Sequence, residues 1–236
     1  MYGDQGRYAE AEALFLETLQ GGRRVWGRDH PFTLDFTLGL GMVYREWGRY
    51  EQAEAVLTEA LEGKRRVLGL EHTYTLWAMN ELARLYIIQV RYDEAEPLLI
   101  DALEIGRRVS GDDHPFTLSS ANSLGVLRRD QGRYGYAKLL LDEALAGRTR
   151  TLGPDHPACF ESMHELAVYY GEQERYVDAE ALLLAAYHGR ETKLGAEHPH
   201  TVESLKQLVR LYGSWNKPDE AASWRAKLPR ADDATE

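Results

Sequence analysis

The sequence predicts an all-α protein: a right-handed superhelical α-solenoid of antiparallel helix pairs. Three observations lead to this prediction. The chain repeats itself every 42 residues, each repeat holds two stretches of helical apolar periodicity, and no segment shows the alternation of a strand. Because one helix pair cannot bury its own apolar faces, neighbouring pairs must stack on each other. We expect about five pairs, preceded by one unpaired N-terminal helix.

The repeat is visible at positions that keep one phase along the chain. An Arg-Tyr pair begins at residues 7, 49, 91, 133 and 175, and every step is 42 residues. Other residue classes hold the same spacing with no insertion: Ala11, Ala53, Ala95, Ala137, Ala179 and Ala221; Gly27, Gly69, Gly111, Gly153 and Gly195; His30, His72, His114, His156 and His198. Such agreement predicts a series of equivalent modules.

The units of the array follow from this phase. A half repeat covers residues 7–28, and complete units lie near residues 31–69, 73–111, 115–153, 157–195 and 199–228, within an array over residues 1–229. Residues 230–236 form a short acidic tail. Residues 1–5 leave no room for the first helix of the opening unit. We therefore expect a fragment whose first helix is uncovered near Tyr8 and Phe15.

Two kinds of connection separate the helices. In the second complete unit the apolar side chains fall three and four residues apart on one helical face, as do Leu76, Met79 and Leu82. A short turn such as residues 130–133 joins the helices of a pair, and Gly132 suits the left-handed conformation that ends a helix. The longer connection carries Gly-x-Asp/Glu-His-Pro, in which glycine ends one helix and proline begins the next.

Composition and charge narrow the classes of function. The chain has 28 Lys+Arg against 38 Asp+Glu, a formal net charge of −10, which disfavours nucleic acid or an anionic membrane as partner. The single cysteine, Cys159, cannot form an internal disulfide, and the N-terminus has no secretory signal, so we expect a cytoplasmic protein. No apolar run reaches the roughly 18–20 residues that a bilayer crossing needs.

No pattern predicts catalysis. The periodic histidines occur once per unit, on the order of 10 Å apart, whereas the ligands of one zinc ion each lie near 2 Å from it, so we expect them to cap helices. Cys159 stands where other units have threonine, and we interpret it as a small residue at a helix start. The sequence therefore predicts no enzyme, no cofactor and no metal site.

The unit also resembles a known family. It carries Leu-Ala/Gly-x-x-Tyr in the first helix, Gly-Arg-Tyr in the turn, Ala-Glu-x-Leu-Leu and Ala-Leu in the second helix, and Leu-Gly-x-Asp-His-Pro after it. From about Gly6 to Leu228 this pattern resembles the tetratricopeptide repeat, and its 42-residue form is similar to that of kinesin light chains. The resemblance implies that the first helices of the units line a concave groove that binds an extended or helical peptide of a partner protein.

The family's groove pattern, carried over position by position, implies a set of binding residues. Asn80 and Asn122 match the asparagine with which light-chain-type repeats hold a peptide backbone, and Leu38, His164 and Lys206 replace it in the other units. A guanidinium fork suits a carboxylate, so an acidic peptide is a candidate ligand. The remaining groove positions implied are Arg45, Trp77, Arg84, Ile87, Ile88, Arg129 and Arg210.

Alternatives stay open for these residues and for the function. The groove arginines can instead be solvated or paired with Glu46, Asp130 and Glu203. The three apolar residues at 77, 87 and 88 can form an anchor pocket or pack on the neighbouring unit. The chain can also be a structural or regulatory arm of a larger signalling protein. That arm would act by packing on its own effector domain or by self-association as a homodimer through the uncovered N-terminal helix.

Overall fold

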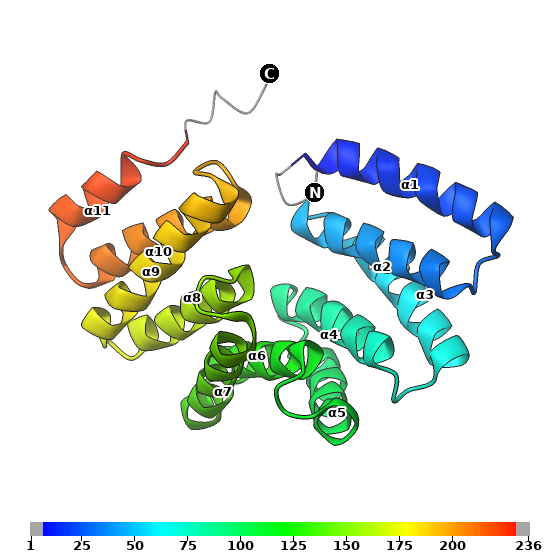
Figure 1. The fold of residues 1–236 in the computed structure, drawn as a ribbon. Coiled ribbons are helices and arrows are strands. Elements are labelled where there is room, and N and C mark those ends of the chain that lie inside the picture. Colours follow the sequence, from blue (N-terminus) through cyan, green and yellow to red (C-terminus); the bar gives the residue numbers. More distant parts are fainter. Residues whose placement is uncertain (1–6, 230–236) are drawn as a thin grey trace. The chain divides into compact units, whose positions relative to one another are not determined.

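The computed structural model describes residues 7–229, and within that range it confirms the all-α prediction: there are eleven helices and no strand. The expectations for residues 1–5 and for the acidic tail lie outside the described residues. The helices, labelled in Figure 1, are α1 Tyr8–Val25, α2 Pro31–Glu46, α3 Tyr50–Leu68, α4 Thr73–Ile88, α5 Tyr92–Ser110, α6 Pro115–Asp130, α7 Tyr134–Leu152, α8 Pro157–Glu172, α9 Tyr176–Leu194, α10 Pro199–Ser214 and α11 Pro218–Arg225.

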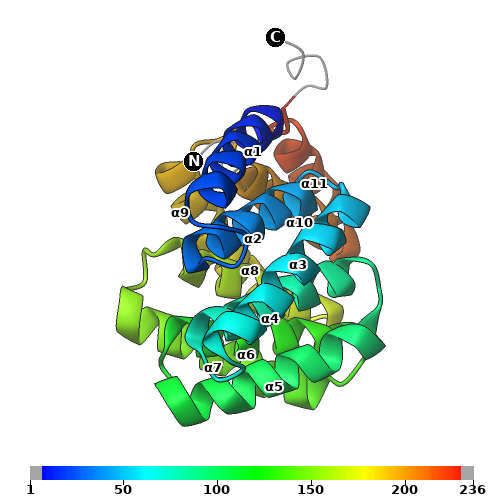
Figure 2. The ribbon, with the colours of Figure 1, turned by 90° about the vertical axis from the view of Figure 1, so that its right-hand side faces the viewer.

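The chain divides into two compact units, Met1–Leu127 and Arg128–Glu236, with the boundary inside α6. In the first unit each helix from α1 to α5 packs on the next, and α2 also contacts α4 (Figures 1 and 2). In the second unit the same holds from α7 to α11, with α8 contacting α10. Each unit is therefore a stack of helix pairs in which consecutive first helices touch.

The first helices of the pairs share one kind of N-terminus. Nδ1 of His30 accepts a hydrogen bond from the backbone N–H of Phe32 at 3.3 Å. This bond satisfies an N–H that has no partner inside the helix, which is the role usually taken by serine or aspartate. The same bond recurs at His72, His114, His156 and His198. The predicted capping role of the periodic histidines is thus confirmed.

The short turns inside each pair require a left-handed residue. Gly132 has a φ of 74°, as predicted, and the N–H of Arg133 beyond it donates to the carbonyl of Arg128 at 2.7 Å, closing the end of α6. The same conformation is adopted without glycine at Val90, Glu174 and Asn216, where φ is 60°, 58° and 57°. The repeat therefore imposes this backbone even at Val90, where a β-branched side chain opposes it.

Small residues let the helices of a pair approach closely. Ala53, Ala95, Ala137 and Ala179 are fully buried. At Gly63 in α3, a Cβ would lie 2.3 Å from Cδ2 of Leu34 in α2, so only glycine fits this contact.

The first helix, α1, is covered on one side only. Phe15 packs against the hydrophobic cluster of the first unit and Tyr8 stacks on Trp47, so both rings are half-buried although the helix start lacks a preceding helix among the described residues. The uncovered side chains are instead those on the flanks of α1, where Leu14 is 52% and Leu16 47% exposed. Across residues 7–229 no helix is both long and apolar enough to span a membrane.

Candidate functional site

The repeat position expected to hold a peptide backbone is mostly buried. It lies on the first helix of each pair, and only Lys206 is exposed there. The exposed fractions of the other four residues are 0% for Leu38, 1% for Asn80, 3% for Asn122 and 8% for His164. In most repeats this position belongs to the packing between helices.

Asn80 shows how that packing is made in the first unit. Its Nδ2 lies 3.2 Å from Oγ of Ser119 on α6 and donates a hydrogen bond to it. Its Oδ1 is buried and accepts no hydrogen bond within the described residues. A peptide backbone would reach that oxygen only after the Asn80 amide turned out from between α4 and α6.

Arg45, expected in the groove, forms a buried ion pair between two first helices. Its side chain is 4% exposed and pairs with Glu81 of α4, which is also 4% exposed, and with Glu46 at 2.8 Å. Sequence reasoning named Glu46 as an alternative partner of the groove charges without assigning it to Arg45, and it missed Glu81. The signal that would have found it is a spacing of 36 residues, which recurs between Arg129 and Glu165.

Arg129 repeats this arrangement in the second unit. It pairs with Asp130 at 2.9 Å and with Glu165 of α8 at 2.8 Å, and its side chain is 9% exposed. Burial alone would lower the pKa of Arg129, but the carboxylates of Glu165 and Asp130 outweigh it and raise that pKa above the ordinary value. The third proposed pair, Arg210 with Glu203, has its charged atoms 3.8 Å apart on the exposed surface of α10.

The apolar residues of α4 separate into packed and accessible ones. Trp77 stacks on Phe116 of α6, with ring centroids 5.5 Å apart and planes inclined by 6°, and it also contacts Tyr74. Packing on the neighbouring pair is therefore the role observed for Trp77. Ile87 is half-buried, as is Arg84, whereas Ile88 is 49% exposed.

His164 sits inside a polar cluster of the second unit. Its Nδ1 lies 3.4 Å from Nη1 of Arg190, which comes from the last turns of α9. A guanidinium can only donate, so Nδ1 accepts and the ring is neutral. Burial, helped by the nearby Arg190 and Arg129, lowers the pKa of His164 to about 4, although Glu165 acts in the opposite direction.

Sequence reasoning missed the basic residues at the ends of the second helices. Lys64, Arg148 and Arg190 occupy one repeat position and are all buried. Lys64 pairs with Asp35, and Arg148 pairs with Glu161 at 3.0 Å. The available signal was a basic residue on the apolar face of an amphipathic helix, where burial requires a partner.

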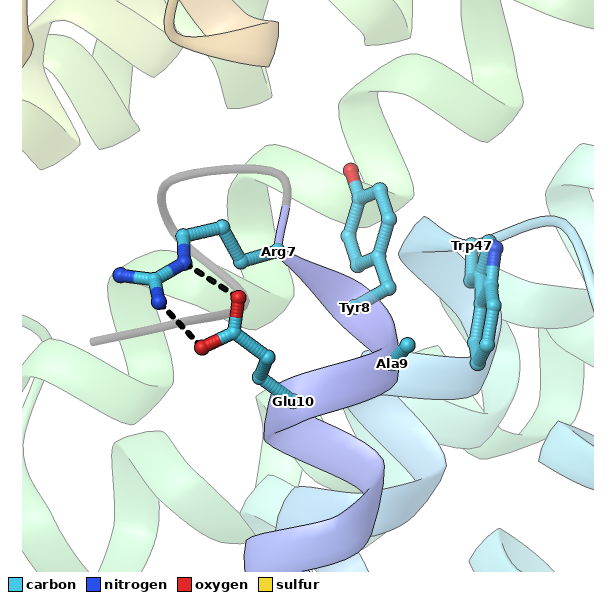
Figure 3. Close-up of a pocket in the computed structure, with 5 residues that line it drawn as sticks. All are labelled: Arg7, Tyr8, Ala9, Glu10 and Trp47. Carbon is cyan, nitrogen blue, oxygen red and sulfur yellow. Dashed lines mark hydrogen bonds and ion pairs between the residues drawn. The ribbon is translucent and has the colours of Figure 1, made fainter. Parts of the chain in front are cut away.

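A hollow of about 250 Å³ lies at the start of α1, lined by Arg7, Tyr8, Ala9, Glu10 and Trp47. Figure 3 shows the rings of Tyr8 and Trp47 beside it, with centroids 6.1 Å apart, and the ion pair between Arg7 and Glu10. The guanidinium of Arg49 lies 3.4 Å from the ring centre of Trp47. The hollow is small and bounded on one side by an internal ion pair.

The groups considered for chemistry have structural roles. Sγ of Cys159 donates to the carbonyl of Gly153 at 3.2 Å, as Oγ1 of Thr75 does to Gly69 at 2.8 Å. The interpretation of Cys159 as a helix-start residue is therefore confirmed. Over the part of the chain that the structure describes, no three His, Cys, Asp or Glu side chains are grouped so as to hold a metal ion.

Comparison with known proteins gives a consistent picture. The family model described as tetratricopeptide repeat matches residues 1–66, 37–89, 74–149 and 137–192. A solved structure of putative kinesin light chain nearly identical TPR-like repeats from Podosopora anserina is 28% identical, covers 84% of this chain and 94% of that chain, and has a TM-score of 0.60. BtubC (BKLC) from P. vanneervenii is similar in fold, with 19% identity, coverage of 93% and 88%, and a TM-score of 0.67. No protein of curated function matches.

Proposed function

The chain belongs to the tetratricopeptide repeat family, and on that premise we propose that it binds an extended or helical peptide of a partner protein on its first helices. Repeats of this family generally mediate protein–protein interactions and are typically non-enzymatic, and the proposal assigns this chain the same kind of role. We include a cytoplasmic location, because the one cysteine is buried and unbridged.

The observation that carries the proposal is a row of three side chains along one face of α4. Trp77, Arg84 and Ile88 are spaced by seven and four residues and so share one face of the helix. None of the three is fully buried, and Ile88 is 49% exposed. An aromatic ring, a guanidinium and an aliphatic side chain in a row can contact the alternate side chains of a bound peptide.

The other groove residues have different roles in this proposal. Lys206 and Arg210 are exposed on α10 and are available to acidic side chains of a ligand. Arg45 and Arg129 hold adjacent first helices together through their ion pairs. Asn80, Asn122 and His164 contact a ligand in this proposal only by turning away from their packed positions. Ile87, which is half-buried, is the neighbour of Ile88 in the chain.

The test compares two substitutions with the same change in charge. Ile88→Glu places a carboxylate on the proposed face, and Ala55→Glu places one on the exposed side of α3. Both proteins are used, beside the unaltered chain, to capture partners from a lysate of the source organism, and the affinity for a captured partner is then measured by calorimetry. We expect Ile88→Glu to weaken binding by about tenfold or more, as for a residue in the centre of an interface.

The control decides the result. Ala55→Glu should bind the partner within about twofold of the unaltered chain, because exposed positions outside an interface contribute little. A partner whose affinity is unchanged by Ile88→Glu, or equally reduced by both substitutions, would rule out the α4 face as its binding site.

A second candidate function is self-association through α1. Leu14 occupies the repeat position of Val56, which packs against the core of the first unit, yet Leu14 is 52% exposed. A second copy that covered this flank would bury it. Sedimentation over a concentration series should then show a dimer that Leu14→Glu abolishes. A chain that stays monomeric at the highest concentration would exclude this role.

A further inference from the structure

Two arginines of the second unit occupy equivalent positions, and the first of them is fully paired. Nη1 of Arg148, at the end of α7, donates to the carbonyl of Ala158 at 2.8 Å and to Oγ of Ser162 at 2.9 Å. It also pairs with Oε2 of Glu161 at 3.0 Å. The buried charge of Arg148 is therefore balanced by a carboxylate from the next helix.

One repeat later, Arg190 keeps the two neutral contacts and lacks the carboxylate. Its Nη1 donates to the carbonyl of His200 at 3.1 Å and to Oγ of Ser204 at 2.7 Å. The residue equivalent to Glu161 is Glu203, whose nearest ion-pair contact is with Arg210 at 3.8 Å. Among residues 7–229, no carboxylate lies within 4.0 Å of the Arg190 guanidinium.

The unused edge of Arg190 has the geometry of a carboxylate receptor. All its hydrogen bonds, including the one to Nδ1 of His164, are made by Nη1. Among residues 7–229, Nε and Nη2 have no hydrogen-bond partner. Their N–H groups lie along one edge of the guanidinium, where the two oxygens of a carboxylate fit side by side. Neither nitrogen is among the described side-chain atoms that are both unpartnered and sealed from solvent, so each keeps some contact with solvent.

The charges around Arg190 favour an added anion. Arg190 is 6% exposed, and burial lowers its pKa even though Glu161, Glu165 and Glu203 act in the opposite direction from farther away. The first two of these carboxylates are already paired, with Arg148 and with Arg129. A buried charge without a counter-charge is unfavourable, and a ligand carboxylate would supply that counter-charge.

We propose that Arg190 is a carboxylate-binding subsite, in which an acidic side chain or the C-terminal carboxylate of a bound peptide docks on the Nε and Nη2 edge. The subsite deepens the proposed function and rests on it, because it names one chemical group of the ligand. His164 and Ser204 hold the guanidinium in place from its other side.

The experiment observes the Arg190 Nε–H directly by ¹⁵N NMR of the full chain, with the signal identified by its loss in Arg190→Lys. The first probe is N-acetyl-Gly-Gly-Glu-Gly-Gly-amide, which carries only a side-chain carboxylate. The second is N-acetyl-pentaglycine with a free C-terminus, which carries only a terminal one. We expect at least one probe to shift the Arg190 signal to saturation, and the responding probe identifies the source of the carboxylate.

Matched controls make this result specific. The probe with glutamine in place of glutamate and an amidated end should leave the NMR signal of Arg190 unchanged. The signal of Arg148 should not shift with any probe, because Arg148 is already paired with Glu161. Arg190→Lys keeps the charge but loses the two parallel N–H groups, so it should lower the affinity for the probe about tenfold. Because the Arg190 signal is absent in this variant, the affinity is measured from the NMR signals of the peptide. No saturating shift at Arg190, or equal shifts at Arg148, would overturn the proposal.

Glu203→Gln tests whether the chain fills its own subsite. If Glu203 remains with Arg210, this substitution should change probe affinity by less than about twofold. Probe binding that appears only in Glu203→Gln would overturn the proposal, because Glu203 would then be the natural occupant. A partner that depends on Ile88 but not on Arg190 would reject the subsite and leave the proposed function standing.

Discussion

The guanidinium of Arg45 and the carboxylate of Glu81 form an ion pair between α2 and α4 in which both side chains are 4% exposed. The second unit holds the same pair, Arg129 with Glu165, between α6 and α8 at 2.8 Å. In the repeat between them the two positions are Ile87 and Ser123, so both charges are absent together. A buried charge is thus present in this series only where its counter-charge is present.

This relationship predicts a rescue experiment on stability. Arg45→Ile leaves the Glu81 carboxylate buried without its partner, and we expect the free energy of unfolding to fall by about 3–5 kcal/mol. Adding Glu81→Ser reproduces the pair found in the next repeat and should recover most of that loss. Urea unfolding of the two variants measures both steps. Equal stabilities of the single and double variants would contradict the pairing.

Replacing Val90 with glycine should stabilise the folded protein. Its φ of 60° is unfavourable for a β-branched residue, while Gly48 and Gly132 hold the equivalent place in other repeats. We expect Val90→Gly to raise the free energy of unfolding by about 1 kcal/mol, since the relief of strain exceeds the added chain entropy. Gly48→Val is the reverse change and should destabilise. Thermal unfolding checks both, and a loss of stability in Val90→Gly would count against this account.

Two glycines at one repeat position should respond oppositely to alanine. At Gly63 the new Cβ would lie 2.3 Å from Cδ2 of Leu34, whereas at Gly21 nothing lies within 4 Å. Gly63→Ala should therefore cost about 1–3 kcal/mol through overpacking. Gly21→Ala should gain about 0.5–1 kcal/mol because alanine favours the helix. Similar effects at both sites would show that α2 and α3 are less closely packed than described.

The lowered pKa of His164 predicts that the free energy of unfolding depends on pH. Burial lowers its pKa to about 4, from an ordinary value near 6.5 in the unfolded chain. Between these values the unfolded state binds the proton and the folded state does not, so stability falls as the pH drops from about 6.5 to about 4. The loss should approach about 3 kcal/mol at the lower end.

The control for this prediction is His164→Asn, because asparagine occupies the same position in two earlier repeats. The difference between the unfolding free energies of the two proteins isolates the histidine from the carboxylates that also titrate. We expect that difference to change between pH 6.5 and 4. A constant difference would show that His164 is protonated as easily in the folded chain as in the unfolded one.

The helices and their ends were predictable from sequence because their causes are local. A helical face is defined by spacings of three and four residues, and the cap formed by His30 reaches only two residues along the chain to Phe32. Each local pattern recurs every 42 residues, so the conformation predicted for the turn at Gly132 could be extended to the equivalent turns of the other repeats.

The candidate site was less predictable, because position on a helix does not say how far away the next helix lies. The sequence alone determined that the helices pair and that the pairs stack. Only the tertiary structure decided that Asn80 is enclosed, that Arg45 is bound to Glu81, and that Arg190 lacks the carboxylate that Arg148 has. Those outcomes depend on distances of a few ångströms between side chains 13 to 39 residues apart, which periodicity does not encode.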